Sequence, residues 1–160
     1  MLSVLRTLRW LFVGVPLVLV IAVVVLPACV SVTAPARTTG AYKVHATKTA
    51  EAVVSALKTA SLTVEMAERD RAFPPYVSVS LGEAESDAGG VQSSFESIQP
   101  PGARSDDLRA QLVPLLDEAT GALADARIAA RRNDTDALAA TAEPLDRAAR
   151  ELEAFLEEHG

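Results

Sequence analysis

Residues 46–67 read ATKTAEAVVSALKTASLTVEMA and carry the clearest periodic pattern in the chain. Small apolar residues recur in them with alternating spacings of four and three, which places them on one face of an α-helix. The residues of this apolar stripe are Ala46, Ala50, Val53, Leu57, Ala60, Val64 and Ala67. The pattern therefore predicts a helix over residues 42–72. The prolines of Phe73-Pro74-Pro75-Tyr76 end it, because proline cannot extend the helical hydrogen-bond ladder.

Three further segments repeat this alternation, and we predict helices over residues 76–99, 105–132 and 135–158. The second stripe consists of Val77, Leu81, Ala84, Ala88, Val91, Phe95 and Ile98. The third consists of Leu108, Leu112, Leu115, Ala119, Ala122, Ala126 and Ala129, and the fourth of Leu138, Ala142, Leu145, Ala149, Leu152 and Leu156. A β-strand over residues 77–81 competes with the second helix, but it explains five residues where the helical pattern explains twenty-two.

Four amphipathic segments with short connections favour an antiparallel arrangement, because a short connection places successive helices side by side. We therefore expect an all-α chain in which residues 42–160 form an up-down four-helix bundle. Of the whole sequence 49% is hydrophobic but only 4% is aromatic, so alanine, valine and leucine must build the core. Side chains this small imply a thin core and helices that approach closely.

Several local signals predict where these helices begin and end. Ser105-Asp106-Asp107 has the composition of a helix N-terminus. Asn133 accepts the left-handed backbone conformation that often follows a helix, and Asp134 or Thr135 can cap the fourth helix. Acidic and basic residues are also spaced for i,i+4 pairing on the exposed faces. These pairs are Glu65 with Arg69, Glu143 with Arg147, and Asp146 with Arg150.

The N-terminal region has the pattern of a membrane anchor. Residues 10–32 contain no charged side chain and follow Arg6 and Arg9. A helix of this length is about 34 Å long, which is enough to cross a hydrocarbon core of about 30 Å. We expect residues 1–9 to be a cytoplasmic n-region, residues 10–32 a single-pass anchor in the cell membrane, and residues 33–41 a tether. The C-terminal domain then lies outside the membrane, and the anchor makes membrane lipid a partner.

A second interpretation of the same region involves lipidation. Leu26-Pro27-Ala28-Cys29 resembles the lipobox of bacterial lipoproteins, in which the signal to residue 28 is removed and Cys29 is acylated. Pro27 departs from that pattern, and the apolar stretch before Cys29 is longer than a usual signal h-region of about 7–15 residues. Under this alternative the domain is lipid-anchored through Cys29.

A few residues break the helical pattern and are candidate contact or hinge positions. Gly89-Gly90 lies inside a predicted helix and costs about 2 kcal/mol relative to two alanines. Pro114 and Pro144 each remove a ladder hydrogen bond, so they predict kinks. Phe73 and Tyr76 flank a helix-ending proline pair and are expected to be exposed at a helix end.

The sequence offers no grouping of residues for catalysis, cofactor binding or metal binding. The chain has one Cys and two His, too few for a cysteine-built zinc site or Cys-x-x-Cys-His haem attachment. No Glu-x-x-His motif of a di-iron bundle occurs. Neither His45 nor His159 is flanked by plausible triad residues. We therefore predict no cofactor and no enzymatic activity.

Charge and architecture together lead to a functional hypothesis. Residues 33–160 hold 13 basic and 21 acidic residues, a net charge of −8 that disfavours nucleic-acid binding. We expect a non-enzymatic accessory or scaffold component of a bacterial cell-envelope complex, acting through a protein partner. The alternative is a bundle that binds a small ligand where Gly89-Gly90, Pro114 and Pro144 open the helices, or that senses one through a partner.

Overall fold

The computed structural model describes residues 38–160, and within that range the chain is all-helical without strands. The expected anchor, tether and Cys29 lie wholly or mainly in residues 1–37, outside the described part. The helices are α2 (Thr39–Glu68), α3 (Pro74–Glu96), α4 (Ala103–Arg131), α5 (Thr135–Ala139) and α6 (Ala142–His159). None of them is both long and apolar enough to cross a membrane. The all-α prediction is confirmed for these residues, and the strand alternative over 77–81 is wrong.

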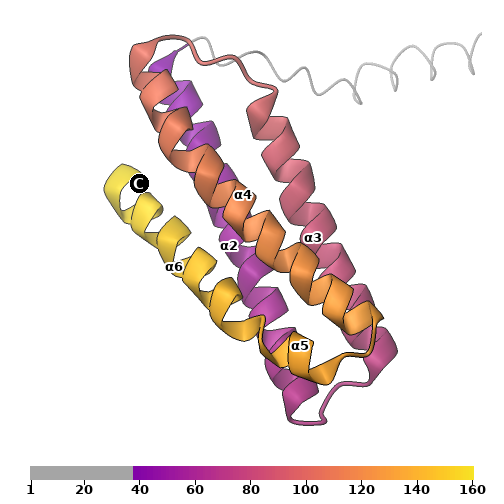
Figure 1. Cartoon of the computed structure of the whole chain (residues 1–160). Helices are drawn as coiled ribbons and strands as arrows, with labels where there is room; N and C mark the ends of the chain where they lie inside the picture. Colours follow the sequence, from indigo (N-terminus) through magenta and orange to yellow (C-terminus); the bar gives the residue numbers. More distant parts are fainter. Residues whose placement is uncertain (1–37) are drawn as a thin grey trace, which may run out of the picture. The chain divides into compact units, whose positions relative to one another are not determined.

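The four long helices of the described region pack as a bundle in which successive helices run in opposite directions (Figure 1). Helix α2 packs against both α3 and α6, and α4 completes the ring by packing against the same two helices. Helices α2 and α4 also contact each other across the diagonal. Alanine at many inward positions allows this close diagonal approach.

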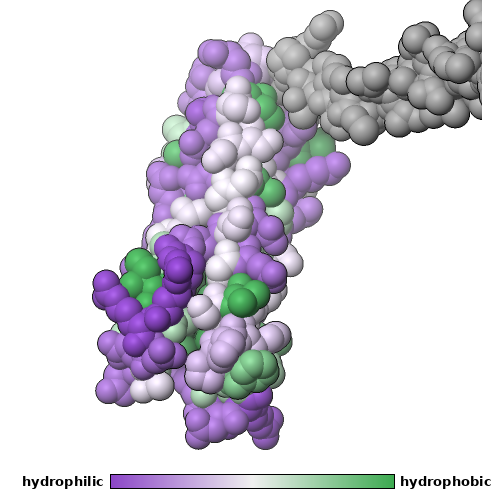
Figure 2. Space-filling model, turned by 90° about the vertical axis from the view of Figure 1, so that its right-hand side faces the viewer, coloured by the Kyte–Doolittle hydropathy of each residue, from purple (hydrophilic) through white to green (hydrophobic). Residues whose placement is uncertain are grey.

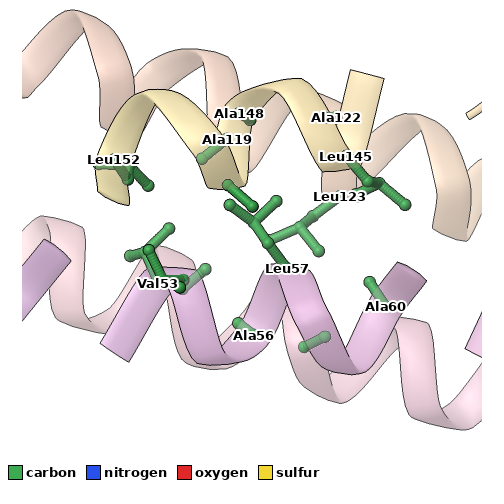
Figure 3. Close-up of a cluster of buried hydrophobic side chains, with 14 of the residues drawn as sticks. Val53, Ala56, Leu57, Ala60, Ala119, Ala122, Leu123, Leu145, Ala148 and Leu152 are labelled. Carbon is green, nitrogen blue, oxygen red and sulfur yellow. The ribbon is translucent and has the colours of Figure 1, made fainter. Parts of the chain in front are cut away.

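The stripe predicted for α2 is confirmed, and its buried face is wider than that stripe. Six of its seven residues are buried and Ala67 is half-buried against the core. Because α2 contacts three long helices, further residues at its flanks are buried as well. These are Tyr42, Thr49, Val54, Ala56 and Thr63. Figure 3 shows labelled side chains of α2, α4 and α6 pointing into the space between the helices.

The other stripes hold with a few shifts. In α4, Leu116 is fully buried and the expected Leu115 is only half-buried. The four later positions of the predicted stripe are buried as expected, so the shift is confined to one turn of α4. In α6 the buried set includes Phe155, which the predicted stripe omits.

Two left-handed residues form the corners at one end of the bundle. Asp70 has φ 54° and Asn133 has φ 52°, so the expectation for Asn133 is confirmed. At both corners the next residue closes a Schellman motif, with the Arg71 N–H donating to the Met66 carbonyl at 2.8 Å. Asp134 caps α5 by accepting a hydrogen bond from the Ala137 N–H at 3.0 Å.

The cap expected for α4 is wrong. The N-cap is Gly102, which offers no side-chain hydrogen bond. Ser105 lies within the first turn of the helix and is fully buried, so its hydroxyl faces the core instead of the free N–H groups. Asp106 does occupy the first turn, where a negative charge favours the helix dipole.

The fourth predicted helix is divided in two, and this corrects the kink expected at Pro144. The chain breaks after α5, where Thr141 donates hydrogen bonds from its N–H and its hydroxyl to the Leu138 carbonyl. Pro144 therefore lies in the first turn of α6. First-turn N–H groups have no partner within a helix, so a proline there removes nothing. Pro114, in contrast, does lie inside α4, on its exposed side.

Of the three expected i,i+4 ion pairs, two are present. Glu65 contacts Arg69 at 2.5 Å, and Glu143 contacts Arg147 at 3.2 Å. The third acid, Asp146, instead accepts a hydrogen bond from the Ser61 hydroxyl of α2 at 2.8 Å. That bond links α2 to α6 across the bundle surface.

Candidate functional site

Two aromatic residues singled out in the sequence lie exposed where α2 connects to α3. Phe73 is 68% exposed and Tyr76 is 49% exposed, with their ring centroids 6.4 Å apart. Val79, one turn further along α3, is 59% exposed. We call these three residues the apolar corner. In Figure 2 the apolar surface is broken into separate patches, several of them in the lower half, toward the end at which α2 and α3 are connected.

The backbone of this connection fixes the aromatic residues in place. Phe73 is the N-cap of α3, and its carbonyl accepts hydrogen bonds from the N–H groups of Tyr76 and Val77 at 3.0 and 3.3 Å. Pro74 and Pro75 occupy the first positions of the helix, where no N–H is needed. The proline pair therefore begins α3, and the prediction that it ends the preceding helix is wrong, because α2 already ends at Glu68.

An apolar cavity of about 160 Å³, which we call the tip pocket, opens beside this corner. Its walls come from the ends of α2, α3 and α4 and from α5. The apolar lining residues are Ala67, Ala72, Pro74, Val77, Ala129, Ala130 and Leu138. Polar residues at its rim are Asp70, Asn133, Asp134 and Thr135. Both left-handed corner residues belong to this rim, and the small alanine side chains leave the space unfilled.

This end of the bundle carries equal numbers of acidic and basic side chains. Residues 68–71 and 131–136 together hold four acidic and four basic residues. Among the described residues, the carboxylates of Asp70 and Asp134 form no ion pair, and neither do the guanidinium groups of Arg71 and Arg132. The end therefore presents unpaired charges of both signs around an apolar pocket.

The irregular residues predicted to open one ligand site are not brought together. Gly89 lines an open polar groove of about 480 Å³ between α3 and α4. Pro144 lines a different hollow of about 360 Å³ between α4 and the α5–α6 region, while Pro114 borders none of these cavities. A Cβ added at Gly89 or Gly90 would meet nothing within 4 Å, so internal packing does not require either glycine.

Two polar contacts span the groove between α3 and α4. Arg127 donates to Glu85 through Nε and, at 3.2 Å, through Nη2, and this hydrogen bond raises the pKa of Arg127. Gln92 donates to Asp117 at 2.6 Å. These contacts join the two helices beside the glycines, and the positive charge of Arg127 is paired with the negative charge of Glu85.

Within residues 38–160 no group of His, Cys, Asp and Glu is placed to hold a metal ion. His159 packs on the ring of Phe155 with centroids 4.5 Å apart, and its Nε2 lies 2.9 Å from the Gln111 side-chain oxygen. His45 is half-buried on α2 at the start of the bundle. His159 is therefore held by packing and a hydrogen bond at the end of α6.

Comparison with protein-family models, curated proteins and solved structures gave no match to this chain.

Proposed function

We propose that this protein is a non-enzymatic, membrane-anchored scaffold or accessory component of a bacterial cell-envelope complex. It acts through protein contacts at the end of the bundle that carries the apolar corner and the tip pocket. The observation that carries this proposal is the exposure of Phe73, Tyr76 and Val79 beside an apolar cavity. Aromatic residues are enriched in protein interfaces, where they act as anchors that fill apolar pockets.

The apolar corner lies at the end of α2 that is farther from residues 1–37, which supports contact with a partner away from the attachment point. Residues 1–37 join the bundle at the start of α2, and the apolar corner follows the other end of that helix. A helix of 30 residues is about 45 Å long. With residues 10–32 in the membrane, the part of residues 33–41 that precedes α2 as a tether and the C-terminal domain outside, α2 separates the contact surface from the attachment point. Acylation of Cys29 would give the same attachment.

The charge of the bundle favours a protein partner over nucleic acid. Residues 38–160 carry 12 basic and 21 acidic residues. A net charge of −9 repels phosphate backbones, whereas the balanced charges around the tip pocket do not repel a protein.

A small apolar ligand is the second candidate, because the tip pocket has the volume and lining to hold one. Such a ligand would raise the melting temperature of the purified protein, since it binds only the folded state. A partner-binding scaffold shows no such shift with small molecules.

Photo-cross-linking in intact cells tests the proposed function. A benzophenone amino acid replaces Tyr76 in one variant and Val44 in a control, since Val44 is comparably exposed near the opposite end of α2. We expect a protein adduct from position 76 and none from position 44. The absence of a protein adduct from position 76 would refute the proposal. Intact mass of the captured chain tests acylation at Cys29, and protease digestion of spheroplasts tests whether the C-terminal domain is outside.

A further inference from the structure

We propose that the partner at the tip pocket is a second copy of this chain, with Phe73 of each copy entering the pocket of the other. This inference rests on the proposed function, because it names the partner of the same surface. It depends on three properties of this end of the bundle: the size of the pocket, the place of Phe73 and the pattern of charge.

The size of the pocket fits an aromatic ring. The tip pocket measures about 160 Å³ and its walls are mainly apolar. An apolar cavity of about 150 Å³ in another protein binds benzene, so a phenyl ring is a suitable occupant. Among the large hydrophobic side chains of the described region, Phe73 is the most exposed. The chain therefore carries both an apolar pocket and a ring of the size that fills it.

The place of Phe73 suits a two-fold symmetric contact. Its sequence neighbours Ala72 and Pro74 both line the tip pocket, so the ring and the pocket belong to one small patch. In an isologous dimer the same patch faces itself, and each contact is made twice. One substitution in Phe73 or in the pocket would consequently remove two contacts.

The charges around the patch are complementary to themselves. Residues 68–71 read Glu-Arg-Asp-Arg, so acidic and basic side chains alternate beside Phe73. Asp70 and Asp134 line the pocket without an ion-pair partner in residues 38–160. Arg71 directly follows Asp70, Arg132 lies two residues before Asp134, and neither arginine has an ion-pair partner in this range. In a two-fold contact the acids of one copy can face the bases of the other. Elsewhere the excess of acidic residues makes two copies repel each other.

The test uses the full-length chain in its own membrane, expressed as two copies with different epitope tags. The benzophenone amino acid replaces Phe73, which keeps an aromatic ring at that position. We expect a covalent product that carries both tags, with the cross-link mapped to the lining residues within 67–77 or 129–138. A second variant, Phe73→Asp, should reduce the two-tag product formed by a chemical cross-linker about tenfold or more, as loss of an aromatic anchor does.

Filling the pocket provides a matched pair of variants. Ala72→Leu occupies the tip pocket, whereas Ala124→Leu adds the same bulk at a half-buried position of α4 outside it. We expect the first to reduce the two-tag product and the second to leave it unchanged. Equal effects of the two variants would overturn the proposal.

The outcomes separate this inference from the proposed function. A cross-link from position 73 to a different protein would overturn self-association and leave the scaffold function standing. A cross-link confined within one chain, with no adduct to any protein, would refute both. Circular dichroism of Phe73→Asp confirms that the bundle is folded, so a loss of product reports on the contact itself.

Discussion

Two buried hydroxyl groups at the end where α2 begins have no hydrogen-bond partner in the described part of the chain. They belong to Tyr42 of α2 and Ser105 of α4, and both side chains are fully buried. The Tyr42 ring packs against Phe95, with centroids 5.4 Å apart. A buried polar group without a partner loses its hydrogen bonds to water on folding. These hydroxyls therefore weaken the bundle, although the ring that carries one of them strengthens it.

Replacing Tyr42 with Phe should stabilise the protein, because the ring stays and the unpartnered hydroxyl is removed. We expect the free energy of unfolding to rise by roughly 1 kcal/mol in urea titrations. Ser105→Ala should act in the same direction. A loss of stability in Tyr42→Phe would show that the hydroxyl has a partner in solution.

The same hydroxyl predicts a dependence on alkaline pH. Burial raises the pKa of Tyr42 above its usual value of about 10, although the nearby Arg109 guanidinium opposes this. Above the usual value the unfolded chain loses the proton while the native chain still holds it, so stability falls as pH rises. In the Tyr76→Phe background Tyr42 is the single tyrosine, and tyrosinate absorbance should give a midpoint above 10. A midpoint at or below that value would contradict the burial argument.

Pro114 and Pro144 differ in the helical hydrogen bond that each removes. Pro114 lies inside α4 and leaves the Ala110 carbonyl without its helical donor. Both residues are exposed, so water can reach that carbonyl and reduce the cost. Pro144 lies in the first turn of α6, where no such bond exists.

The pair Pro114→Ala and Pro144→Ala tests this difference. We expect Pro114→Ala to stabilise the bundle by about 1–3 kcal/mol, since it restores a ladder bond. Pro144→Ala should change stability by less than about 0.5 kcal/mol. Chemical denaturation of both variants measures the difference, and equal effects would show that α5 and α6 behave as one helix in solution.

The sequence predicted the helical stripes because a stripe depends only on local spacing. Asn133 and Asp134 were predictable for the same reason, since corner and cap chemistry depends on adjacent residues. The division between α5 and α6 was not predictable. The spacing of apolar residues is the same whether a proline kinks a continuous helix or lies in the first turn of a new one. Phe73 and Tyr76 could be identified from their proline neighbours. The tip pocket could not, because two corners some sixty residues apart in the sequence build it.

The stability of the bundle depends on the thin core that α2 shares with its neighbours. Leu57 is fully buried near the middle of α2, among alanines and leucines of α4 and α6 (Figure 3). Leu62 lies on the same helix but is 56% exposed. A core made of small residues has few large side chains, so each leucine in it contributes a large share of the buried apolar area.

Substituting these two leucines separates core packing from helix propensity. Leu57→Ala should lower the free energy of unfolding by about 2–5 kcal/mol, because it leaves a cavity in the core. Leu62→Ala should change it by less than about 0.5 kcal/mol. Thermal and urea unfolding of both variants provide the comparison, and a small effect of Leu57→Ala would mean that the helices close around the space.

The even number of long antiparallel helices in residues 38–160 turns α6 back toward the end of the bundle where α2 begins, and α6 stops short of that end (Figure 1). The packing of the four long helices therefore does not require the present order of the helices along the chain. A linker from Gly160 to Thr39 that is long enough to cover this gap, with new termini opened in the connection between α3 and α4, should yield the same packing from a rearranged sequence. That connection, like the linker, lies away from the tip pocket. Rewiring of this kind would let a reporter protein be attached at three places on one end while the opposite end stays free to bind.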